Sequence, residues 1–265
     1  MGKISREIWR FFFFLNAVCS FLILFPAFWL FLRNKRTFPK VFKLKRWWSG
    51  ILIYFPGIRY RVLRECSVPW PEPCVICPNH ASYLDIIMTY RVIPHYFHFM
   101  GKAELKKVPL FNRFFDHMNI LVDRSSIVAS HKAFVRAGED IDRGISIAIF
   151  PEATIPECTP EIGRLKNGAF KLAIEKQVPI VPVVFLDNWK VLPDSPRKKV
   201  YAGSPGLLRV VIHDPIPTKG MKESDLASLK EAYRKVMDET LLKYGVLEES
   251  ADLKYHGWQS KGQTG

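Results

Sequence analysis

The chain begins with an apolar block and then changes to a mixed pattern of short and long amphipathic segments. An uncharged run of 22 residues extends from Phe11 to Leu32, and a second apolar stretch follows at Trp47–Tyr60. As a helix, the first run would be about 33 Å long, enough to cross the hydrocarbon core of a bilayer. Pro26 interrupts this run, and the tryptophans of the second stretch are typical of the headgroup level. Two helices lying in the interface therefore fit the pattern as well as a single span does.

Beyond Arg64, short runs of β-branched and apolar residues alternate with amphipathic stretches of helix length. Strands that alternate with helices predict an α/β fold, with a mainly parallel mixed sheet flanked by helices. The expected strands are Cys74–Cys77, Ile120–Val122, Ser146–Phe150, Ile180–Phe185 and Leu208–Ile212. The expected helices are Ile127–Arg143, Asn167–Lys176 and Leu226–Tyr244.

These patterns divide the chain into three parts. Residues 1–65 are expected to form an N-terminal helical segment associated with a membrane, and residues 66–245 an α/β domain. Residues 246–265 are polar, and we expect them to be a loose C-terminal tail.

Charge is distributed unevenly between these parts. The 265 residues include 39 Lys+Arg and 25 Asp+Glu, which gives a net charge of +14. No Asp or Glu occurs between Ile8 and Arg64, and residues 1–72 hold about +10 of the total. Basic, aromatic and apolar residues together favour a membrane surface over nucleic acid, for which the body carries no recognition motif. The positive residues are more numerous after the apolar run than before it, which predicts that the body lies on the cytoplasmic side.

The five cysteines are irregularly spaced, which argues against the disulfide framework of a secreted protein. Cys74 and Cys77 form a Cys-x-x-Cys pattern, which occurs in redox pairs and zinc sites. No second pair is present, and the two intervening residues are β-branched. A buried strand with its thiols on opposite faces therefore fits better than a reactive pair. We expect no metal site.

Candidate chemistry lies in two loops that follow predicted strands, where α/β proteins bind their ligands. The first loop reads Pro78-Asn79-His80-Ala81-Ser82-Tyr83-Leu84-Asp85. Ser82 and Asp85 resemble a capping box, which would begin a helix through Val92 and leave His80 in the loop. A carboxylate beside an imidazole fixes its tautomer and supports its protonated form, as a general base on a hydroxyl requires. Considered alone, the loop also fits a helix cap beside an incidental histidine.

The second loop is Pro151-Glu152-Ala153-Thr154, after the strand at 146–150. Taken together, the two loops make the sequence resemble the glycerolipid acyltransferase family. Within that family, it resembles the 1-acylglycerol-3-phosphate acyltransferases. Members carry Asn-His-x-Ser-x-x-Asp, followed later by Phe-Pro-Glu-Gly-Thr. Further stretches match the family in order, over about residues 70–216: Lys102–Leu105 with Pro109, Val122–Arg124, Lys166–Ala173 and Val178–Val183.

The resemblance implies transfer of an acyl group from acyl-CoA or acyl carrier protein to the hydroxyl of a lysolipid at a membrane. His80 would act as the general base and Asp85 would orient it, without a metal, a cofactor or a covalent acyl-enzyme. Glu152 and Thr154 would hold the head group of the acceptor, with a capped loop as the alternative role. The residues expected to bind substrate are Asn79, Ser82, Lys102, Arg124, Glu152, Ala153 and Thr154.

Two positions of the second loop depart from the family pattern. Ala153 stands in place of a glycine, a small change unless its φ angle is positive. Ile155 stands in place of an arginine that many members using lysophosphatidate carry, and a guanidinium suits phosphate oxygens well. Other cations could serve instead: Lys102, Lys106, Lys107, Arg124, Arg164 and Lys166.

Three hypotheses of function follow from these observations. The first is acylation of 1-acylglycerol-3-phosphate to phosphatidate. The second is the same chemistry on another acceptor, such as a lysophospholipid or an acylated amino-acid lipid, which Ile155 keeps open. The third is a non-catalytic basic protein that binds a membrane or nucleic acid.

Overall fold

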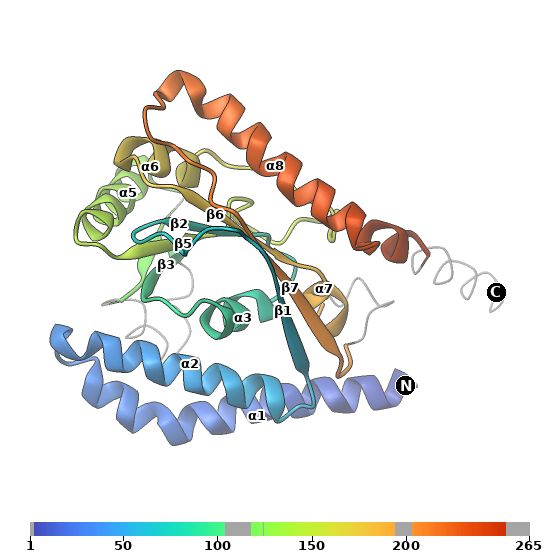
Figure 1. Ribbon diagram of the computed structural model, residues 1–265. Coiled ribbons are helices and arrows are strands. Elements are labelled where there is room, and N and C mark those ends of the chain that lie inside the picture. The colour runs from blue at the N-terminus through green and yellow to red at the C-terminus, as the bar shows by residue number, and fades with distance from the viewer. Residues whose placement is uncertain (1–2, 104–117, 124, 194–202, 253–265) are drawn as a thin grey trace.

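A mixed sheet with helices on both faces forms the centre of the structure, a computed structural model that describes residues 3–103, 118–123, 125–193 and 203–252 (Figure 1). Its strands are β1 (Arg59–Glu65), β2 (Val75–Pro78), β3 (Phe97–Lys102), β4 (Ile120–Val122), β5 (Ser146–Ile149), β6 (Ile180–Phe185) and β7 (Leu207–His213). The helices are α1 (Lys3–Phe31), α2 (Phe38–Tyr54), α3 (Leu84–Val92), α5 (Ile127–Asp142), α6 (Gly168–Lys176), α7 (Asn188–Val191) and α8 (Leu226–Lys243).

The strand order is β1-β7-β6-β2-β5-β3-β4. Strands β6, β2, β5, β3 and β4 run parallel to one another, β7 is antiparallel to β6, and β1 is parallel to β7. The sheet is therefore mixed and mainly parallel, as the sequence predicts. Ile76 of β2 lies opposite Ala148 of β5, so these neighbouring strands end at the same edge of the sheet. The loops that follow them meet there, at the edge where α/β proteins bind ligands.

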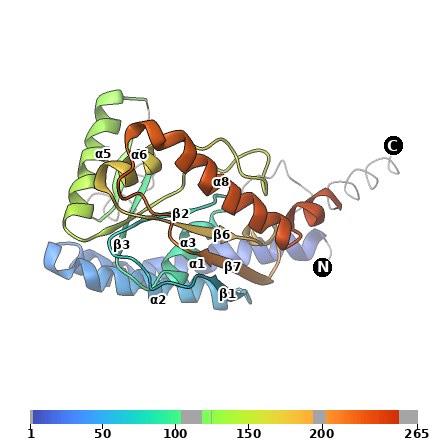
Figure 2. The same ribbon diagram turned by 45° about the horizontal axis from the view of Figure 1, so that its top comes forward.

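Alternating side chains along the strands divide the core into two layers. Val75 and Cys77 pack with residues of α5, α6 and α8, whereas Cys74 and Ile76 pack with residues of α1, α2 and α3. Figures 1 and 2 show these two groups of helices on opposite faces of the sheet. Both thiols are buried and free, and burial raises the pKa of Cys74 to about 12. Cys77 lies in β2 and Cys74 directly precedes it, so the strand is displaced by one residue from the predicted Cys74–Cys77, while the two thiols are buried on opposite faces as predicted.

The N-terminal segment is a hairpin of α1 and α2, and α2 lies between α1 and α3 (Figure 1). Hydrogen bonds join it: Trp48 Nε1 donates to Ser20 Oγ at 2.9 Å, and Trp9 Nε1 donates to the Pro56 carbonyl at 2.8 Å. Among the described helices, α1 is the one long and apolar enough to cross a membrane. Its outer side carries large apolar side chains that remain exposed: Ile4, Ile8, Phe11, Phe12, Phe14, Leu15, Val18, Leu22, Ile23, Trp29 and Leu30. We call this surface the outer face of α1.

The structure shifts both predicted boundaries of the α/β domain. Strand β1 pairs with β7 from Arg59 to Glu65, so the sheet begins before residue 66. Apolar alternation did not reveal this edge strand because arginines occupy its exposed positions. At the other end, residues 246–252 are helical and Val246 is fully buried. The first part of the predicted loose tail therefore packs against the domain, because its first residue, Val246, is apolar.

Candidate active site

The loop after β2 brings His80 and Asp85 together. His80 lies just past the end of the strand, and Asp85 lies in the first turn of α3. Nδ1 of His80 is 2.9 Å from Oδ2 of Asp85, and the two side chains are 14% and 0% exposed. The same Oδ2 accepts hydrogen bonds from the backbone N–H groups of Ala81 and Ser82. Because Asp85 acts as the acceptor throughout, the network assigns the imidazole proton to Nδ1 and leaves Nε2 as the basic nitrogen.

Asn188 completes the surroundings of the Asp85 carboxylate. Its Nδ2 donates to Oδ1 of Asp85 at 2.7 Å, and the residue is fully buried at the beginning of α7. The neighbouring Asp187 accepts three hydrogen bonds from Arg209, which fixes this turn to β7. Four donors therefore satisfy a buried carboxylate, which would otherwise be costly to remove from water.

Sequence reasoning missed Asn188. It lies 103 residues beyond Asp85, and no spacing rule connects two residues so far apart. One signal was available: the polar pair Asp187-Asn188 follows the predicted strand at 180–185, in the same way that His80 and Glu152 follow theirs. Polar residues after a third strand of a parallel sheet were candidates for the same edge.

Glu152 joins the two loops by their backbones. Its Oε1 accepts from the N–H of His80 at 2.7 Å, and its Oε2 accepts from the N–H of Gly163 at 2.7 Å. Burial raises the pKa of Glu152 to about 7, and the two amides oppose this effect only in part. Both oxygens are engaged within the protein. In the structure Glu152 holds the backbone of His80 in place, and its contact with the acceptor stays a prediction.

Asn79 and Ser82, also predicted to bind substrate, are buried and bonded within the protein. Asn79 donates to the carbonyl of Phe185 at 3.2 Å and accepts from its N–H at 2.7 Å, which joins the ends of β2 and β6. The Ser82 hydroxyl donates to the Leu192 carbonyl and accepts from the N–H of Leu84. These two residues thus shape the loop that carries His80.

The ring of His80 stacks on Phe150, with centroids 4.2 Å apart and planes 15° apart. Phe150 stacks in turn on Phe99, at 5.8 Å, and packs against the core layer that contains α1, α2 and α3. The imidazole is therefore held on the side of the sheet that the N-terminal hairpin covers. Stacking fixes the plane of the ring, and Asp85 fixes its rotation within that plane.

Of the remaining residues predicted to bind substrate, the structure describes the side chains of only some. Ala153 has a φ angle of +66°, in the left-handed region, so the change from glycine is not small. Thr154 is exposed beside it. The side chain of Lys102 lies outside the described residues, as do Lys106, Lys107 and Arg124.

Arg164 and Lys166, the described members of the predicted substitute cations, are exposed. Their segment is bound to the second loop, because the N–H of Lys166 donates to the Pro151 carbonyl at 2.8 Å and that of Gly163 donates to Glu152. Both cations therefore lie on the loop system that carries His80.

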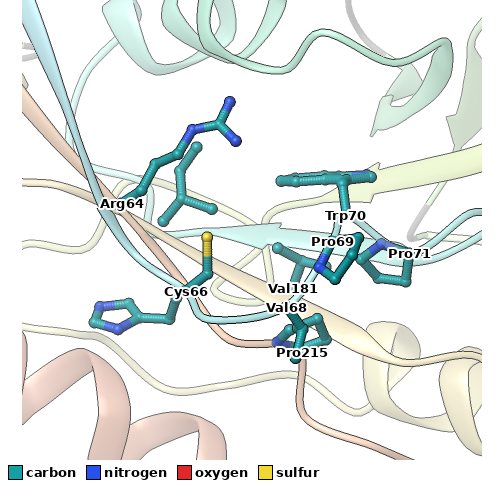
Figure 3. A pocket seen from close by; sticks show the side chains of 10 residues that line it. Arg64, Cys66, Val68, Pro69, Trp70, Pro71, Val181 and Pro215 are labelled. Carbon is teal, nitrogen blue, oxygen red and sulfur yellow. The ribbon is translucent and has the colours of Figure 1, made fainter.

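A small pocket of about 60 Å³ lies elsewhere (Figure 3). It is found where β2 and β6 begin, whereas His80 follows the end of β2. Its lining residues are Arg64, Cys66, Val68, Pro69, Trp70, Pro71, Val181, Ile212, His213 and Pro215. The pocket is thus separate from the candidate active site. Within the described ranges, no group of three or more His, Cys, Asp or Glu residues is arranged to hold a metal ion.

Comparison with known proteins identifies the domain that carries this site. A family model described as Acyltransferase matches residues 59–186. These residues belong to the acyltransferase family. The acyltransferase domain includes His80, Asp85 and Glu152, and the match ends two residues before Asn188. Membership of an enzyme family makes the hypothesis of a non-catalytic binding protein wrong.

Relatives of the acyltransferase domain include proteins from animals and fungi. Human 1-acyl-sn-glycerol-3-phosphate acyltransferase beta is 28% identical over 198 residues, which are 74% of this chain and 69% of the relative. The 1-acyl-sn-glycerol-3-phosphate acyltransferase of Saccharomyces cerevisiae is 30% identical over 193 residues, 71% of this chain and 62% of the relative. The crystal structure of PlsC, the 1-acyl-sn-glycerophosphate acyltransferase of Thermotoga maritima, has a TM-score of 0.70 at 23% identity. This likeness covers 95% of this chain and 98% of that chain, so the two share a fold that extends beyond the acyltransferase domain.

Replacing Ala153 by glycine should stabilise the protein. The left-handed conformation costs an alanine roughly 1–2 kcal/mol, and glycine gives back about 0.4–1 kcal/mol through the greater entropy of the unfolded chain. We therefore expect Ala153→Gly to raise the free energy of unfolding by about 0.5–1 kcal/mol in denaturant titrations. Ala133→Gly, a helical position in α5, should lower it. A loss of stability in Ala153→Gly would contradict the strain at this position.

Asn188 should act on the reaction through Asp85. Asn188→Leu leaves Oδ1 of Asp85 without its donor, which should lower kcat/KM by about 10- to 100-fold. In Asn188→Asp two carboxyl groups face each other and cannot both ionise easily, so the new acid can still donate a proton at low pH. The activity of Asn188→Asp relative to the unsubstituted enzyme should therefore fall as pH rises. A ratio that stays constant across pH profiles of kcat/KM would indicate a merely structural role.

Proposed function

We propose that this acyltransferase moves a fatty acyl group from acyl-CoA or acyl carrier protein to the free hydroxyl of 1-acylglycerol-3-phosphate, giving phosphatidate. The observation that carries the proposal is the buried Asp85 carboxylate, 2.9 Å from Nδ1 of His80, within a domain of the acyltransferase family. The names of the human, yeast and Thermotoga proteins support the choice of acceptor.

The reaction that fits this geometry is a direct transfer. Nε2 of His80 takes the proton of the acceptor hydroxyl while its oxygen attacks the thioester carbonyl. The new carbon–oxygen bond forms, the carbon–sulfur bond breaks, and the departing thiolate recovers the proton from the imidazolium. Asp85 stabilises that imidazolium through the hydrogen bond to Nδ1. Because the acceptor itself attacks, the scheme needs no acyl-enzyme.

The surrounding residues support this role by restricting His80 before substrate arrives. Glu152 holds the backbone of His80, Phe150 holds the ring plane, and Asp85 holds the tautomer. A base fixed in this way loses little freedom in the transition state, which is a principal source of catalytic advantage.

The phosphate of the acceptor needs a cation, since Ile155 cannot bind it. Arg164 and Lys166 are exposed on the segment bound to the Glu152 loop. We assign the acceptor phosphate to these two residues, with Arg164 as the stronger ligand because a guanidinium can make two parallel hydrogen bonds to phosphate oxygens.

The N-terminal hairpin is proposed to hold the enzyme on the membrane that contains the acceptor. The outer face of α1 is a continuous exposed apolar surface, and the candidate active site lies on the side of the sheet that the hairpin covers. Positive residues follow the apolar run, which favours the cytoplasmic side for the acyltransferase domain. A lysolipid would then reach His80 without leaving the surface of the bilayer.

The full-length protein in mixed micelles, given labelled acyl-CoA and a panel of lysolipids, should convert 1-acylglycerol-3-phosphate to labelled phosphatidate. His80→Ala should lower this rate by about 10²- to 10⁴-fold, the usual contribution of a general base. His131→Ala removes an exposed histidine of α5 and should leave the rate unchanged. Faster acylation of a different lysolipid would overturn the assignment of the acceptor, and an unimpaired His80→Ala variant would overturn the assignment of the base.

The assignment of the phosphate can be tested with a charged and an uncharged acceptor. Arg164→Ala should raise the KM for 1-acylglycerol-3-phosphate by about tenfold or more, because a hydrogen bond to a charged group is lost. The KM for a neutral monoacylglycerol should change little. Lys132→Ala, which removes an exposed cation of α5, serves as the control. Equal effects of Arg164→Ala on both acceptors would show that Arg164 does not bind the phosphate.

A further inference from the structure

A groove on the C-terminal half of α2 lies outside the candidate active site. It has a volume of about 330 Å³, within the range of ligand sites in proteins. Residues of α2 and the position after it line the groove together with Arg91 of α3: Trp47, Gly50, Ile51, Tyr54 and Phe55. The aromatic side chains are largely exposed, at 59% for Trp47, 54% for Tyr54 and 70% for Phe55.

One end of the groove is cationic. Arg91 donates from Nε to the hydroxyl of Tyr60 at 3.0 Å and from Nη2 to the hydroxyl of Tyr54 at 3.3 Å. Its Nη1 lies beside Gly50, where a Cβ would be 3.8 Å away. A guanidinium has five N–H donors, so these two bonds leave donors for a ligand.

A second guanidinium stands close to Arg91. Arg46 donates to the carbonyl of Ile93 at 2.6 Å, and burial together with the positive charge of Arg91 lowers the pKa of Arg46. The hydrogen-bond partners of both arginines are neutral, and residues 8–64 contain no Asp or Glu. These neutral hydrogen-bond partners do not compensate the two positive charges, and a bound anion would complement them.

The other end of the groove is apolar and continuous with the outer face of α1. Phe55 stacks on Phe12 of that face, with ring centroids 6.2 Å apart and planes 21° apart. A ligand that used both ends would need a phosphate-like anion at one end and an aliphatic chain at the other. A free phosphate would leave the aromatic floor unused, whereas a phospholipid fits both ends.

We propose that this groove binds one anionic phospholipid, with its phosphate at Arg91 and its acyl chains over Trp47 and Phe55 along the outer face of α1. Arg91 lies in the last turn of α3 and Asp85 in the first, about 9 Å apart along the helix axis. None of the residues that line the groove belongs to the candidate active site, so the lipid site is separate from the proposed site of the acceptor, and lipid binding can be tested without acyl transfer.

The test is a titration of the full-length protein in nonionic detergent at high salt, followed by native mass spectrometry. The two probes are dioctanoyl phosphatidylglycerol and dioctanoyl phosphatidylcholine, which share chains and differ in net charge. We expect one phosphatidylglycerol per protein, with a Kd at least tenfold lower than that for phosphatidylcholine. Arg91→Gln should raise the Kd for phosphatidylglycerol by tenfold or more.

Three further variants separate a specific site from general attraction to a basic surface. Gly50→Leu fills the groove without changing the charge, and it should also raise the Kd for phosphatidylglycerol by tenfold or more. Gly50→Ala should fold normally, because its Cβ would meet only ordinary contacts at 3.8–3.9 Å. Lys43→Gln removes an exposed charge from the same helix and should leave the Kd within twofold.

Three results would overturn the proposal. Equal weakening by Lys43→Gln and Arg91→Gln would show that diffuse charge accounts for binding. Trp47→Ser removes a groove side chain that lies outside the core. If Gly50→Leu and Trp47→Ser both bound phosphatidylglycerol with wild-type affinity, the groove would be excluded as the binding site. Displacement of the lipid by inorganic phosphate at an equal concentration would show that the site binds the phosphate group alone and gains nothing from the acyl chains.

Discussion

The carboxylate of Asp85 has no contact with solvent, and the arrangement of the loops at the candidate active site follows from the need to satisfy it. A buried carboxylate is tolerable only when donors surround it. Here the donors come from three places: the imidazole of His80, two backbone amides of the loop before α3, and Asn188 on α7. The geometry of the proposed base is therefore set by the turn after β6 as much as by its own loop.

The same principle explains the connection between the loops after β2 and β5. Glu152 is a second buried carboxylate, and its two oxygens bind the backbones of His80 and Gly163. These bonds are possible because β2 and β5 are parallel neighbours that end at one edge of the sheet. An acid predicted to contact the acceptor thus also fixes the backbone of His80.

Local patterns predicted well those features that depend on neighbouring residues. The strands Ile120–Val122 and Ile180–Phe185 have the bounds expected from their apolar runs, and the pairing of His80 with Asp85 follows from a short loop before a helix. Features that depend on distant contacts were missed. Strand β1 carries arginines along its exposed side, and only its pairing with β7 makes it part of the sheet. The partnership of Asn188 with Asp85 arises from tertiary packing, which no residue spacing encodes. The positive φ of Ala153 belongs to a local turn, in which its N–H donates to the Phe150 carbonyl at 3.0 Å.

The pairing of β1 with β7 also has a consequence for how the chain is made. Arg59 pairs with Leu207, so a ribosome synthesises the hairpin and β1 long before the strand that completes this edge of the sheet. During that interval the outer face of α1 and the unpaired edge of β1 are both uncovered, and such surfaces are prone to association with other chains. Early contact with a bilayer would cover the more apolar of the two, so the segment proposed to anchor the finished enzyme would also protect the nascent one.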